Sequence, residues 1–140
     1  MSTVLWANHL KDGVVESDES DKFSLYKFLD KLDSICEKLD ITRISAACDA
    51  TDFRVNLEEL ELPEGMASTD ELMAQSGAWL DAEDAVHMLE TLLSTVTAEN
   101  IRFGIVKNHH QEVVAELEES IAYAKAAAQN NARFNCSIVM

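Results

Sequence analysis

Apolar side chains recur at three- and four-residue steps in three long stretches of the chain, and this period predicts three amphipathic helices. The first helix covers residues 22–39, the second begins after Asp81, and the third runs from Asn108 to about Gln129. The apolar stripe of the first helix consists of Leu25, Phe28, Leu29, Leu32, Ile35, Cys36 and Leu39. Charged side chains fill the opposite face of that stretch, so we expect one side of the helix to pack against a core.

Alternating apolar and polar residues predict strands at both ends of the chain. Residues 4–10 favour a strand, and Asp12-Gly13 offers a tight turn into a short return strand at Val14-Val15. Near the C-terminus every second side chain is apolar: Phe134, Cys136, Ile138 and Met140. We therefore predict a single α+β domain over residues 1–140, dominated by helices. Its small, mostly antiparallel sheet is formed by the N-terminal hairpin and the C-terminal strand.

The middle of the chain gives weaker patterns. Residues 41–49 suggest a short helix, residues 53–57 alternate as a short strand or extended segment does, and residues 58–65 have the composition of a turn. Ser68 is placed to cap a helical turn that reaches Met73. Residues 101–106 fit either a strand or a loop.

Two kinds of residue indicate the core and the compartment. Trp6 and Trp79 are the largest apolar side chains, and we expect both to anchor the core. The three cysteines, Cys36, Cys48 and Cys136, are odd in number and widely separated, which indicates reduced thiols that pack as small apolar groups. With no signal-peptide pattern and no apolar run long enough to span a membrane, the sequence predicts a cytoplasmic protein.

Charge is distributed unevenly along the chain. No lysine or arginine occurs between Arg54 and Arg102, although those forty-seven residues carry eleven carboxylates, and the formal net charge of the whole chain is −15. Such a balance argues against nucleic-acid binding and against docking on anionic lipid, both of which need basic residues. It favours a basic protein partner. Net charge also keeps cytosolic proteins soluble, an explanation that needs no partner.

Six carboxylates around Pro63 lack an evident capping role, and we take them as the candidate partner-binding residues. They are Glu58, Glu59, Glu61, Glu64, Asp70 and Glu71. The leading hypothesis is a small acidic cytosolic binding protein, without enzymatic activity, that engages a basic protein surface. An inhibitor or immunity protein that covers the cationic cleft of a nuclease is one concrete form.

Two alternatives stay open. The chain has no glycine-rich phosphate loop, no paired-cysteine zinc pattern and no Gly-x-Ser-x-Gly elbow, and we predict no cofactor. An enzyme or metal-dependent protein would use His109, His110 and Glu112 with groups from elsewhere, because His109 and Glu112 are three residues apart on one helix face. A homo-oligomer would cover an apolar helix face, since three apolar stripes meet only a modest sheet.

Overall fold

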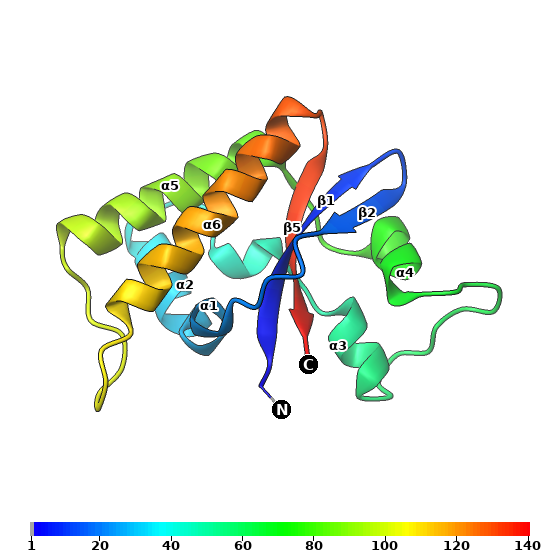
Figure 1. Ribbon diagram of the computed structural model, residues 1–140, viewed down its shortest axis with the longest axis horizontal. Helices are drawn as coiled ribbons and strands as arrows, with labels where there is room; N and C mark the ends of the chain where they lie inside the picture. The colour runs from blue at the N-terminus through cyan, green and yellow to red at the C-terminus, as the bar shows by residue number, and fades with distance from the viewer. Residues whose placement is uncertain (1) are drawn as a thin grey trace.

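The computed structural model describes residues 2–140 as three layers, in which a sheet lies between two groups of helices (Figure 1). The strands are β1 (Val4–Lys11), β2 (Val14–Ser17), β3 (Cys48–Asp49), β4 (Leu80–Asp81) and β5 (Arg133–Val139). The helices are α1 (Phe23–Lys27), α2 (Leu29–Lys38), η1 (Ile44–Ala47, a 3₁₀ turn), α3 (Thr51–Asn56), α4 (Thr69–Ser76), α5 (Ala82–Ala98) and α6 (His110–Gln129). The predicted α+β domain with predominant helices is confirmed.

The two ends of the chain form the centre of the sheet. β1 pairs antiparallel with β5, from Val4 opposite Val139 to Leu10 opposite Arg133, and β2 continues the sheet as the return strand of the N-terminal hairpin. On the other side of β5 lie two-residue strands, β3 parallel and β4 antiparallel. The hairpin and the C-terminal strand are thus confirmed. The sequence did not predict β3 and β4, because strands of two residues are too short to show an alternating pattern.

One face of the sheet carries the hydrophobic core, and α1, α2, α5 and α6 cover it (Figure 1). Leu5 and Ala7 of β1 meet Phe134 and Cys136 of β5 on this side, and none of the four is more than 3% exposed. The apolar stripes of the three long helical stretches are buried here. Each fully buried leucine contributes about 1.5–3 kcal/mol, so this face supplies most of the stability.

The opposite face is polar and is covered by α3 and α4 (Figure 1). Asn8, Asn135 and Ser137 are at most 5% exposed. The alternating pattern at the C-terminus instead predicts that Asn135 and Ser137 face solvent. The expected strand or extended segment at residues 53–57 is wrong, because residues 53–56 belong to α3 and Leu57 caps the end of that helix. One carboxylate oxygen of Asp49 accepts from the Thr51 N–H (3.0 Å) at the start of this helix. The other accepts from the N–H of Ala78 (2.9 Å), a tertiary contact that no local pattern encodes.

The predicted helix at residues 22–39 is divided at Phe28 into α1 and α2. Phe28 has φ −107° and ψ 23°, outside the helical region, and its ring lies 5.5 Å from the rings of both Phe103 and His109. Packing against the loop before α6 therefore interrupts the helix. Lys22, expected as the first helical residue, instead pairs through its backbone with Leu5.

The two tryptophans are half-buried, so the expectation that both anchor the core is not met. The Trp6 indole N–H donates to Asp21 (2.7 Å), and the Trp79 indole N–H donates to the carbonyl of Met73 (2.9 Å). A buried indole needs such an acceptor. Neither ring belongs to the apolar core, and the polar end of each is satisfied outside it.

Several predicted helix ends are confirmed. Ser68 caps α4, which extends past Met73 to Ser76, and Asp81 caps α5 by accepting from the Glu83 N–H (2.9 Å). Residues 101–106 form a loop, and the Asn108 side chain accepts from the first N–H of α6, at His110 (3.1 Å). No helix within residues 2–140 combines the length and the apolar character needed to cross a bilayer.

Candidate functional site

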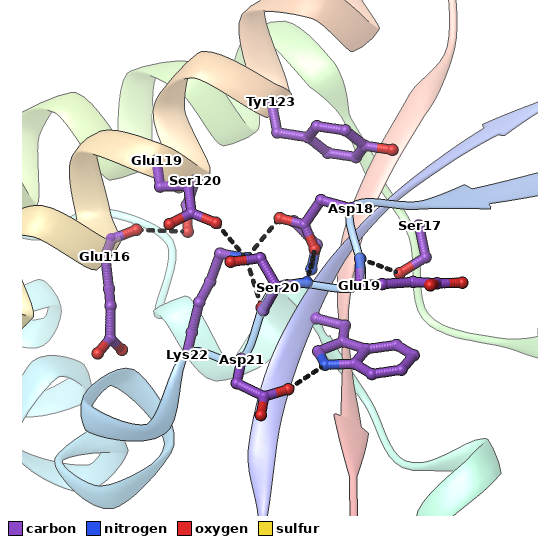
Figure 2. Close-up of polar contacts among 12 residues, drawn as sticks. Ser17, Asp18, Glu19, Ser20, Asp21, Lys22, Glu116, Glu119, Ser120 and Tyr123 are labelled. Atoms are coloured by element: carbon purple, nitrogen blue, oxygen red, sulfur yellow. Dashed lines mark hydrogen bonds and ion pairs between the residues drawn. The ribbon is translucent and has the colours of Figure 1, made fainter.

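Two groups of carboxylates meet at residues 18–22, the segment that joins β2 to α1 and that we call the strap. Figure 2 shows one group around Lys22, while Glu19 points away from it toward the other side of the strap. The groups differ in one respect. The first contains a buried cation, and among residues 2–140 no lysine or arginine lines the second.

Lys22 is completely buried, which is rare for a lysine. Its ammonium donates to Asp18 Oδ2 (2.5 Å) and to the Ser20 carbonyl (3.0 Å), and it pairs with Glu119 Oε1 of α6 (3.4 Å; Figure 2). Three oxygen acceptors replace the three hydrogen bonds that the ammonium makes in water. The cost of removing this charge from water is thereby offset, and the strap is fixed to α6.

Glu116 connects the same helix to α1. Its two carboxylate oxygens accept from the backbone N–H groups of Ser24 (3.3 Å) and Leu25 (2.9 Å). Burial raises the pKa of Glu116, and these two hydrogen bonds oppose that shift because they favour the charged form. Glu116 is therefore a structural carboxylate that holds the first turn of α1.

The second group lines a hollow on the polar face of the sheet, which we call the carboxylate pocket. Its acidic residues are Glu19 of the strap, Asp52 of α3 and Asp70 of α4, and its volume is about 280 Å³. Asn8 of β1 and Ser137 of β5 line it from the sheet. These side chains thus come from the strap, two helices and two strands.

Local hydrogen bonds hold two of these carboxylates in place. Asp52 accepts from the Thr69 hydroxyl (2.7 Å) and from the Asn56 side-chain amide (3.0 Å), which joins α3 to α4. Glu19 has a φ of 48°, in the left-handed region that costs a non-glycine residue about 1 kcal/mol. The Ser17 hydroxyl accepts from the N–H of Glu19 (3.1 Å) and supports this conformation.

The sheet side of the pocket is rigid. The Asn8 side-chain amide donates to Asn135 Oδ1 (2.9 Å) and to Ser137 Oγ (3.1 Å). Asn135 in turn donates to the carbonyl of Ala78 (2.8 Å), so the orientation of both amides is fixed. A network of this kind specifies one arrangement of a buried polar layer.

The pocket is electrostatically uncompensated. None of the ion pairs formed within residues 2–140 includes Glu19, Asp52 or Asp70. Desolvation raises the pKa of Asp70, and the nearby charges of Asp52 and Glu19 raise it further. The direction of this shift means that the neighbourhood disfavours a further negative charge and favours a cation.

The structure divides the six predicted partner-binding carboxylates. Glu58, Glu59, Glu61 and Glu64 are exposed on the loop between α3 and α4, and only Asp70 lines the carboxylate pocket. The N–H of Glu71 donates to Ser68 Oγ (3.4 Å), and its carboxylate accepts from the N–H of Ala67 (3.2 Å). Glu71 therefore supports the start of α4, which makes it a capping residue.

Two residues of the pocket were missed by the sequence reasoning. Glu19 and Asp52 precede Arg54, so they lie outside the segment without basic residues. Asp52 also fell just before a segment expected to be extended, where no helix face was assigned. For Glu19, the sequence carries one signal, the acidic run Glu16, Asp18, Glu19 and Asp21 before Lys22.

The predicted metal residues are engaged in other contacts. His110 Nδ1 lies 2.6 Å from the carbonyl of Ile101, and Glu112 pairs with Lys107 at 3.5 Å. The His109 ring packs against Phe28. Within the described residues, 2–140, no group of three or more His, Cys, Asp or Glu side chains is arranged to hold a metal ion.

The three cysteines are free thiols. Burial raises the pKa of Cys136 to about 12 and that of Cys48 well above its usual value. Burial also raises the pKa of Cys36. The thiolate is the reactive form of cysteine, so these three side chains are apolar packing groups at neutral pH.

Comparison with known proteins gives no relative: no protein-family model, no curated protein and no solved structure matches the chain.

Proposed function

We propose that this is a small acidic binding protein that engages a basic protein surface, and that the carboxylate pocket receives a lysine or arginine side chain of that partner. The observation that carries the proposal is the group of three carboxylates, Glu19, Asp52 and Asp70, that lines one hollow without an internal cation. A cationic side chain from outside would supply the missing charge, as Lys22 does for the neighbouring group.

An extended organic cation suits this pocket better than a metal ion. A hard metal ion needs several oxygens at about 2.0–2.6 Å from one point, and the described acidic residues include no such arrangement. A guanidinium has five N–H donors in a planar fork, and it can contact acceptors on different elements at once. The carboxylates here come from the strap, α3 and α4.

The exposed acids of the loop between α3 and α4 complete the proposed surface. Glu58, Glu59, Glu61 and Glu64 would attract a basic partner over a distance of about one Debye length, roughly 10 Å at 0.1 M salt. Such steering speeds association, while contacts between the cationic side chain and the pocket slow dissociation. In the cytosol, an inhibitor that covers the cationic cleft of another protein would use both effects.

The experiment is a pull-down from native cytosol at low and high salt with three baits. One bait is the wild-type protein, the second is Glu19→Gln with Asp70→Asn, and the third is Glu61→Gln with Glu64→Gln. The last two have equal net charge. We expect a basic protein that wild type retains at low salt, that the loop variant retains nearly as well, and that the pocket variant loses. Recovery of no basic partner at low salt contradicts the proposal.

A further inference from the structure

The loop between α5 and α6 presents two apolar side chains to solvent. Ile105 is 96% exposed and Val106 is 98% exposed, more than any other large apolar residue of the described chain. Figure 1 shows this loop projecting beyond the ends of both helices. We call Ile105 and Val106 the apolar tip.

The apolar tip is held by a dense set of hydrogen bonds. The Arg102 guanidinium donates to the carbonyls of Gly104 (2.8 Å) and Ile105 (2.9 Å), and Asn108 Oδ1 accepts from the N–H of Phe103 (3.0 Å). Phe103 is fully buried and anchors the base of the loop. Two exposed branched side chains on a preorganised loop lose little entropy on binding, which suits them to contact another surface.

Glycine is required in this loop. Gly104 has a φ of +106°, and a Cβ at this position would lie 2.3 Å from the carbonyl oxygen of Lys107. The close approach turns the chain sharply and directs residues 105 and 106 outward.

Basic residues lie beside the tip, although the molecule as a whole is acidic. Arg102 and Lys107 flank it, and Lys31 of α2 donates to the Arg102 carbonyl at its base. Glu112 pairs with Lys107, but both side chains are largely exposed, so the pair is weak. A surface that binds the tip should therefore have apolar residues at its centre and acidic residues around them.

A groove of that description lies between α5 and α6. Its volume is about 540 Å³, within the range of pockets that bind ligands. Leu93 and Ile121 line it together with the carboxylates Glu90 and Glu118. Lys125 also lines the groove and pairs with Glu90 at 3.4 Å, an exposed contact that is easily exchanged.

We propose that the apolar tip of one copy of this chain docks in the α5–α6 groove of a second copy. The apolar pair covers Leu93 and Ile121, and the bases that flank the tip face Glu90 and Glu118. Tip and groove are different surfaces of the chain. Two copies therefore form a closed dimer only if each inserts its tip into the groove of the other; otherwise the contact repeats and builds an open chain of copies. This self-association uses neither the carboxylate pocket nor the loop between α3 and α4.

Sedimentation across a concentration series tests the apolar part of the contact. The variant Ile105→Ser with Val106→Ser should weaken self-association about tenfold or more, while Val14→Ser, at another exposed apolar position, leaves it unchanged. Circular dichroism verifies that both variants fold. We expect them to fold, because the exposed side chains of the tip do not pack in the core. A wild type that stays monomeric at millimolar concentration overturns the proposal, as does a tip variant that associates like wild type.

A charge exchange tests the pairing of the two surfaces. Lys107→Glu places an acid opposite Glu118, and Glu118→Lys places a base opposite Lys107, so each variant alone should associate about fivefold more weakly than wild type. Mixing the two restores the attraction in both directions, and we expect association near the wild-type level. A mixture that associates no better than its components contradicts the assigned contact.

One cysteine added to each chain, beside the three native thiols, tests proximity directly. A chain with Val106→Cys, mixed with a chain carrying Ala122→Cys from the groove, should give a disulfide-linked heterodimer on mild oxidation. Replacing the second chain by Ala115→Cys, an exposed α6 residue outside the groove, should give much less. Equal yields in the two mixtures refute the docking of tip in groove.

Discussion

The two carboxylate groups on either side of the strap show opposite ways of placing negative charge in an acidic protein. Asp18 and Glu119 surround the buried ammonium of Lys22, whereas Glu19, Asp52 and Asp70 share a hollow that contains no cation of its own. Asp18 and Glu19 are adjacent in sequence, so one short segment supplies both groups. The first group is neutralised within the fold, and we propose that the second is neutralised by a cation from a partner.

On the function proposed above, this difference separates structural from functional charge. A carboxylate paired inside the fold contributes to stability, and removing its partner leaves a buried charge uncompensated. Carboxylates that repel one another reduce stability, and binding of a cation would relieve that repulsion. The comparison therefore gives measurable consequences, which differ for the two groups.

The largest expected effect is on stability, at Lys22. Lys22→Met removes the cation between Asp18 and Glu119, and breaking a buried pair in this way costs about 3–5 kcal/mol. We expect the midpoint of thermal unfolding to fall by roughly 10 °C, since about 1 kcal/mol shifts a domain of this size by roughly 3–4 °C. Lys38→Met, at an exposed lysine of α2, is the control and should change the midpoint little. Equal midpoints for the two variants would show that the buried pair contributes nothing.

The next effect is on binding, and it comes from giving the pocket an internal cation. Val139 of β5 lines the carboxylate pocket and is half-buried, so Val139→Lys places an ammonium where a partner side chain is proposed to enter. We expect affinity for a peptide with two arginines and no other charge to fall about tenfold, which corresponds to about 1.4 kcal/mol. Isothermal titration measures it. Val139→Met provides similar length without charge, and similar affinities for the two variants would argue against the pocket as the binding site.

A smaller effect concerns the titration of Asp70. Desolvation, Asp52 and Glu19 raise the pKa of Asp70, so ionisation of this group costs stability at neutral pH. That cost is relieved as the pH falls through the raised pKa toward the unfolded value, and α3 and α4 should gain protection from hydrogen exchange in mildly acidic buffer. Carboxyl NMR should also show a lower pKa for Asp70 in the variant Glu19→Gln. An unchanged pKa in that variant would place Glu19 too far away to matter.

The sequence predicted the apolar side of this molecule well, because periodic patterns record burial against a core. The stripe from Leu25 to Leu39 and the alternation from Phe134 to Ile138 both lie where those patterns placed them, in the hydrophobic core on one face of the sheet. Met140, the last residue of the predicted alternation, lies outside β5 and is exposed. The break at Phe28 was not predictable, because its cause is a ring contact with Phe103, seventy-five residues away.

The polar side was largely missed, for a physical reason. Asn8, Asn135 and Ser137 look like solvent-facing residues of a strand, and only the covering by α3 and α4 buries them. From its sequence position, Lys22 is expected to lie in solvent at the start of a helix. In the structure, oxygens from the strap and α6 surround its ammonium. Of the pocket acids, Asp70 alone was among the predicted residues, because the argument from missing basic residues stopped at Arg54.

The most direct test of the account is an NMR titration with the same diarginine peptide, followed through the indole N–H of Trp6. Trp6 lines the carboxylate pocket, so its signal reports on that site. We predict a saturable shift in wild type that weakens with salt. The shift should disappear in Glu19→Gln with Asp70→Asn and persist in Glu61→Gln with Glu64→Gln, which removes the same amount of charge. Equal loss in both double variants, or no shift in wild type, would contradict the claim that the pocket binds a cationic side chain.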